Sequence, residues 1–150
     1  MGLTDWRERR RAAATFGTGV WRLTADRLAR GLRSYESMAQ GTEPGPARDQ
    51  LEDDFGLLSA AVADGRAACA AAQLGAPSSG LDVPAGPDGA HSAVHQRLTR
   101  LGAEIAAAAE GAALVRVGDL SALQRVHSRS VRARAEATAV REAAEGAVRG

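Results

Sequence analysis

Apolar residues recur with the same spacing in two stretches of the chain, 51–72 and 94–115. Both stretches alternate steps of four and three, which keeps the side chains on one stripe of an α-helix, as in the seam of a coiled coil. The stripe positions are Leu51, Phe55, Leu58, Val62, Gly65, Cys69 and Ala72, then Val94, Leu98, Leu101, Ile105, Ala108, Ala112 and Val115. The pattern predicts two helices, each roughly 33 Å along its stripe, lying side by side as an antiparallel hairpin over residues 47–117.

Two flanking segments also have helical periodicity. Between about Val20 and Ala39, one row of apolar residues faces away from a polar row, so we expect an amphipathic helix that seals one face of the hairpin. A weaker seam begins near Gly118–Ser121 and continues towards Val148. The fold class predicted is an all-α antiparallel bundle of about four helices, built on the hairpin as one domain over residues 1–150.

Glycine and proline mark the boundaries of these helices. All five prolines lie within 44–46 and 75–89, and their exclusion from the other segments supports the helical predictions. We expect a flexible loop over residues 75–89, because an irregular segment of this length is unusual in a compact domain. For residues 1–19 the sequence allows three structures: a separate short helix, a continuation of the next helix, or a mobile tail.

Alanine dominates the apolar composition. The chain contains 34 alanines but only five Phe, Trp and Tyr residues together. Alanine favours helices and buries little surface, so the core should be thin. We therefore expect either self-association or a partner that covers remaining apolar surface.

All 19 basic residues are arginine, the composition that a GC-rich and, we expect, bacterial coding sequence produces by default. Arginine content alone is thus no sign of nucleic-acid binding. Acidic residues outnumber arginines in 41–118, and arginines outnumber acidic residues at both ends. We expect the acidic middle and the basic ends to complement each other inside one bundle.

The favoured function is that of a non-enzymatic helical interaction or assembly module, which binds itself or another helical protein. Its partner-binding surface would be the apolar row Trp21, Leu28, Leu32 and Tyr35, or else the thin alanine seam. The alternative is an electrostatic binder of nucleic acid or an anionic membrane. Its anion-binding residues would be two clusters, Arg7, Arg9, Arg10 and Arg11, and Arg125, Arg129 and Arg132.

No residue set predicts an enzyme, a cofactor or a metal site. His91 and His95 have a spacing that can chelate a metal, with His127 or Asp88 as a further ligand, but two solvent-facing histidines are the simpler interpretation. Cys69 lies on the first stripe, where a buried cysteine behaves as a small apolar residue.

The sequence has neither 18 consecutive apolar residues nor a signal-peptide core near its start. We therefore expect no transmembrane helix and a cytoplasmic protein, with leaderless secretion left open.

Overall fold

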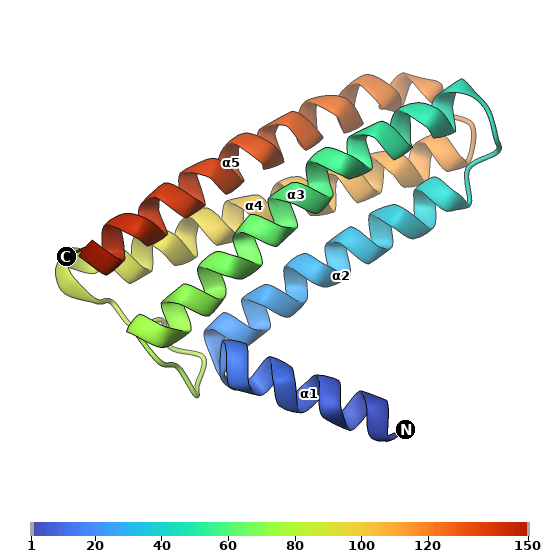
Figure 1. Cartoon of the computed structure of the whole chain (residues 1–150). Helices are drawn as coiled ribbons and strands as arrows, with labels where there is room; N and C mark the ends of the chain where they lie inside the picture. Colours follow the sequence, from blue (N-terminus) through green and yellow to red (C-terminus); the bar gives the residue numbers. More distant parts are fainter. Residues whose placement is uncertain (1, 150) are drawn as a thin grey trace.

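The computed structural model describes residues 2–149 as an all-α chain, with no β-strand in that range (Figure 1). Five α-helices follow one another: α1 Leu3–Phe16, α2 Val20–Gln40, α3 Pro46–Gly75, α4 Ala90–Arg116 and α5 Leu123–Arg149. Two single 3₁₀ turns, η1 Pro87–Gly89 and η2 Leu120–Ala122, precede α4 and α5. The predicted all-α bundle is confirmed, and the additional helix is α1, because residues 3–16 form a helix separate from α2.

Helices α2 to α5 form an antiparallel four-helix bundle in which the chain runs up, down, up and down (Figure 1). Helix α3 packs mainly on α2 and α5, and α4 packs on the same two helices. The two helices of the predicted hairpin therefore occupy opposite corners of the bundle, and the prediction that they lie side by side is wrong. Their connection, residues 76–89, is long because it crosses the end of the bundle from one corner to the other.

The two predicted stripes nevertheless face the core. Thirteen of their fourteen positions are buried, and Phe55 is partly buried. A Cβ atom on Gly65 would lie 2.8 Å from both Leu101 Cδ2 and Leu28 Cδ1. The missing side chain at Gly65 thus makes the space in which leucines from α4 and α2 meet at the centre of the bundle.

Glycines also set the spacing between neighbouring helices. A Cβ on Gly31 of α2 would approach Ile105 Cγ2 of α4 to 2.9 Å, and a Cβ on Gly111 of α4 would approach Val126 Cγ2 of α5 to 2.7 Å. These helices pack closely because the glycine in each contact has no side chain to hold the neighbouring helix away. Close packing compensates in part for the small area that an alanine-rich core buries.

Helix α2 supplies the bulky side chains of the core. Trp21, Leu28 and Tyr35 are buried, and Leu32 is partly buried against them. The Tyr35 hydroxyl donates a hydrogen bond to the Leu51 carbonyl oxygen at 2.7 Å. The pKa of Tyr35 is raised above its ordinary range, mainly by burial and to a smaller extent by the charge of Asp54. The prediction that this helix seals the hairpin is confirmed.

The connection between α3 and α4 packs on the start of α2. The buried hydroxyl of Ser78 accepts a hydrogen bond from the Val20 amide at 3.2 Å and donates one to the Gly80 carbonyl oxygen at 3.1 Å. The Trp21 indole N–H donates to the Ala76 carbonyl oxygen at 2.9 Å. Ser78 therefore satisfies an amide at the α2 N-terminus, a role usually filled by the residue just before the helix.

Helix α3 is long and apolar enough to cross a membrane by length and hydropathy alone. The core helices of water-soluble bundles meet the same criterion, so this property is weak evidence of a membrane span. Here it reflects the alanines that cover both the inner and the outer face of the helix.

Leu101→Asp should lower the free energy of unfolding by about 4 kcal/mol or more, because it places a lone charge at a position with no solvent exposure. Ala103→Asp, at an exposed position of the same helix, is the matched control and should change stability little. Denaturation followed by circular dichroism measures both. Equal midpoints for the two variants would show that Leu101 is not a core residue.

Candidate functional site: helix α1 and the groove between α3 and α5

Helix α1 leaves the bundle at the turn Gly17–Gly19 and projects beside it (Figure 1). Phe16 is its only buried residue, and the Arg66 guanidinium of α3 lies 5.1 Å from the centre of the Phe16 ring. Gly17 has a φ of +71°, a conformation that suits glycine. The helix is thus anchored at its last residue, and most of its length faces solvent.

The outer part of α1 carries exposed apolar side chains. Leu3 is 76% exposed and Trp6 is 49% exposed. They lie three residues apart and therefore on the same side of the helix. The Arg10 guanidinium lies 4.9 Å from the centre of the Trp6 ring, within the range of a cation–π contact. We call Leu3, Trp6 and Arg10 the α1 patch.

An apolar groove lies between α3 and the last turns of α5. Its volume is about 300 Å³. Its apolar wall consists of Ala67, Ala68, Ala71, Ala144 and Val148, and its charged lining residues are Asp64, Arg141, Glu145 and Arg149. We call this the α3/α5 groove. Small side chains on both walls leave room for a larger apolar side chain from another helix.

The chain's own α1 lies on the other side of the same alanine surface. A wider groove of about 690 Å³ separates α1 from α3, and Ala67 lines both this groove and the α3/α5 groove. The outer alanines of α3 therefore form one surface that runs from α1 to α5. Residues of α1 and α5 border it on either side.

The predicted partner-binding row does not form an exposed surface. Trp21, Leu28 and Tyr35 are buried, and Leu32 is partly buried, all within their own chain. The prediction that this row is an exposed docking surface is therefore wrong. Periodicity identifies an apolar face, but a face that packs on its own chain has the same period as one that binds a partner.

The structure does not bring the two predicted arginine clusters together. Arg7, Arg9, Arg10 and Arg11 are exposed on α1, whereas Arg125, Arg129 and Arg132 belong to the half of α5 at the far end of the bundle (Figure 1). Arg129 forms an ion pair with Glu104 of α4 at 3.1 Å, and Arg125 and Arg132 are exposed. No single basic surface joins the two clusters.

Ion pairs instead join α5 to the acidic middle of the chain. Arg134 pairs with Asp64 of α3 at 2.7 Å, and Arg97 of α4 pairs with Glu136 at 3.5 Å. The Arg134 and Arg129 pairs agree, for the C-terminal end, with the prediction that basic ends complement an acidic middle, whereas the Arg97–Glu136 pair has the opposite sense. All these side chains are partly exposed, so each pair stabilises the fold only weakly.

The histidines at the start of α4 pack on the core. His91 is buried and His95 is partly buried, and their ring centres lie 6.5 and 6.1 Å from that of Trp21. Burial lowers the pKa of His95. The prediction of two solvent-facing histidines is wrong, because Trp21 covers this face of α4. Within residues 2–149, no group of three or more His, Cys, Asp or Glu side chains is placed to hold a metal ion.

One polar pair has no signal in the sequence. His127 Nδ1 lies 2.8 Å from Asp54 Oδ1, although 73 positions separate the two residues. The carboxylate comes from α3 and the imidazole from α5. Only the packing of these two helices brings them together, so no local spacing could have indicated the pair.

Cys69 should not react with a thiol reagent while the protein is folded. Its side chain is fully buried, and burial raises the pKa of the thiol to about 12, so almost no thiolate is present at pH 8. Labelling with 5,5′-dithiobis(2-nitrobenzoic acid) should be slow in buffer and complete in denaturant. Rapid labelling of the folded protein would place Cys69 outside the core.

No family model, curated protein or solved structure shows a significant match to this chain.

Proposed function

We propose that the chain is a non-enzymatic assembly module that self-associates by placing α1 of one copy in the α3/α5 groove of another. The observation that supports this proposal is the exposure of the α1 patch. Trp6 is the only exposed one of the five aromatic side chains, and it lies on a helix that leaves the bundle. Exposed aromatic side chains on a projecting element are typical of binding surfaces.

The α3/α5 groove has a suitable size and lining for Trp6. A cavity of about 150 Å³ is sufficient to hold a benzene ring, and this groove has about 300 Å³. Its alanine walls also allow the backbone of an incoming helix to approach closely. The indole would bury apolar surface that α3 and α5 otherwise expose to water.

The groove has charges of both signs, whereas α1 is mainly basic. Helix α1 has four arginines and two acidic residues. The groove is bordered by two acidic residues, Asp64 and Glu145, and by two arginines, Arg141 and Arg149, and Asp64 already pairs with Arg134 at 2.7 Å. Contacts between exposed charges would orient α1 in the groove more than they would tighten its binding.

A second copy is the occupant that the chain itself provides. Each copy carries one projecting helix and one groove, so two copies that exchange these helices satisfy both grooves. Such an exchange is isologous and closes as a two-fold dimer, leaving no free groove for further copies.

Replacing Leu3 and Trp6 by serine should weaken dimer formation by about 1,000-fold, because a two-fold dimer loses two central aromatic contacts of about 2 kcal/mol each. Sedimentation velocity over a range of protein concentrations measures the change. Val117→Ser is the matched control, because Val117 is 80% exposed in the turn after α4, away from both surfaces.

A purely monomeric parent protein would contradict self-association. A dimer that the two serine substitutions leave unchanged would instead show that α1 is not the contact. The dimer should depend little on salt, because its central contact is apolar.

A second candidate function follows from the arginines of α1. Arg7 and Arg11 are exposed and, among residues 2–149, take part in no ion pair, and Trp6 lies on the same projecting helix. A basic helix with an exposed tryptophan also suits an anionic membrane surface or nucleic acid.

Vesicles containing phosphatidylglycerol and a short DNA duplex test this second function. If either binds through α1, affinity should fall steeply between low and physiological salt, and Arg7→Gln with Arg11→Gln should weaken it. Arg125→Gln with Arg132→Gln is the matched control on α5. Equal losses for the two pairs of substitutions would exclude a specific role of α1.

A further inference from the structure

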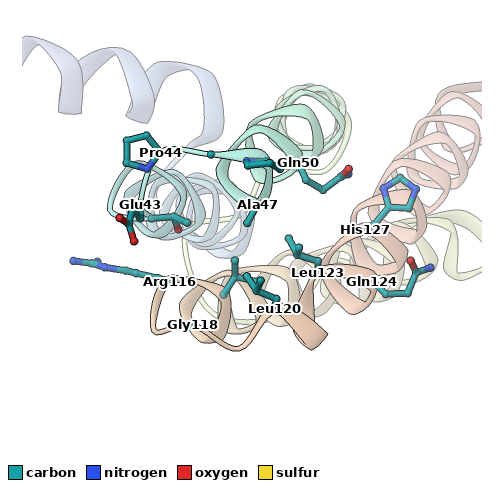
Figure 2. Close-up of a pocket in the computed structure, with 14 residues that line it drawn as sticks. Glu43, Pro44, Ala47, Gln50, Arg116, Gly118, Leu120, Leu123, Gln124 and His127 are labelled. Atoms are coloured by element: carbon teal, nitrogen blue, oxygen red, sulfur yellow. The ribbon is translucent and has the colours of Figure 1, made fainter.

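A cleft of about 790 Å³ lies at the end of the bundle opposite α1, between the α2–α3 turn and the α4–α5 turn. Figure 2 shows side chains from both turns around this space. Its apolar lining includes Ala47, Val115, Leu120 and Leu123. The polar side chains of Gln50, Gln124 and His127 also line it.

A buried carboxylate holds the imidazole of His127. The Asp54 side chain is only 2% exposed, and its Oδ1 lies 2.8 Å from His127 Nδ1. Gln50 Nε2 donates a longer hydrogen bond to Asp54 Oδ2 at 3.4 Å. Burying a carboxylate is costly unless strong partners compensate for the lost water, so His127 is strongly restrained.

The pair also fixes which nitrogen of His127 is free. An ionised carboxylate only accepts hydrogen bonds, so Nδ1 must carry the proton that is shared with Asp54. In the neutral imidazole, Nε2 then has a free lone pair. The His127 side chain is 47% exposed and lines the cleft, which makes this acceptor accessible.

The charged residues of the cleft do not favour an anion next to His127. Arg116 points away from His127 in Figure 2, and its Nη1 lies 3.7 Å from Met38 Sδ. Asp54, directly behind the imidazole, would repel an anion. Glu43 lies on the Arg116 side of the cleft, at a distance from His127 in the same view.

We propose that this cleft binds a small uncharged molecule with an apolar body and one hydroxyl or N–H group that donates a hydrogen bond to His127 Nε2. The apolar body would cover Ala47, Leu120 and Leu123, and the donor would satisfy the acceptor that Asp54 fixes. The cleft is separate from α1 and the α3/α5 groove, so ligand binding at the cleft does not depend on self-association.

Binding of 4-ethylphenol and 4-ethylanisole to the whole protein tests the proposal. The two probes share one apolar body, but only the phenol can donate a hydrogen bond. In ¹H–¹⁵N correlation spectra at pH 8, the phenol should shift the amide signals of Ala47, Leu123 and Gln124 at millimolar concentration. The anisole should bind about tenfold more weakly, as expected for the loss of one hydrogen bond.

Two variants test the role of the His127–Asp54 pair. His127→Leu removes the acceptor and should reduce phenol binding to the level of the anisole. In Asp54→Asn the amide oxygen takes the place of Oδ2 as the acceptor for Gln50 Nε2, which turns the amide N–H towards Nδ1. The imidazole proton then moves to Nε2, and the preference for the phenol should be lost. Arg125→Leu, at an exposed position of α5 outside the cleft lining, is the matched control and should leave binding unchanged.

Three results would overturn the proposal. They are no shifts at the cleft with either probe, equal affinity for the two probes, or an unchanged phenol preference in a folded Asp54→Asn or His127→Leu variant. The comparison of the two probes on the parent protein decides the matter even if both variants unfold.

Discussion

The bundle depends on the contact at its centre, where Leu28 and Leu101 fill the space left by Gly65. An alanine-rich core buries little area per residue, so stability requires that the helices approach closely and that a few leucines fill the remaining volume. Helices α3 and α4 both turn their apolar stripes towards this centre and face each other across the core. Helices α2 and α5 then take the two corners between them.

This arrangement buries the large apolar side chains of the two stripes and most of those on the inner face of α2, whereas ten others, among them Leu74, Leu81 and Val117, stay exposed. The aromatic rings of Trp21 and Tyr35 close the core on the α2 side, and each donates a hydrogen bond to a main-chain carbonyl oxygen. Two features lie outside the central contact, at opposite ends of the molecule. Helix α1 leaves at one end with an exposed Trp6, and a cleft with the restrained imidazole of His127 opens at the other.

The sequence predicted which positions of α3 and α4 face the core, because helical periodicity records burial directly. It did not predict which helices are neighbours, since that depends on how four stripes share one centre. The Trp21 row was assigned to a partner because periodicity does not distinguish an internal apolar face from an external one. Similarly, the burial of His91 and the pairing of His127 with Asp54 arise from contacts between segments far apart in the chain.

The central functional claim is that Trp6 of one copy lies against Ala71 and Val148 of another. An isotope-filtered nuclear Overhauser experiment on a mixture of labelled and unlabelled protein measures this contact directly. We expect cross-peaks between the Trp6 indole of one copy and the Ala71 and Val148 methyl groups of the other. Intermolecular cross-peaks that involve other surfaces, or their complete absence at concentrations where the protein is dimeric, would contradict it.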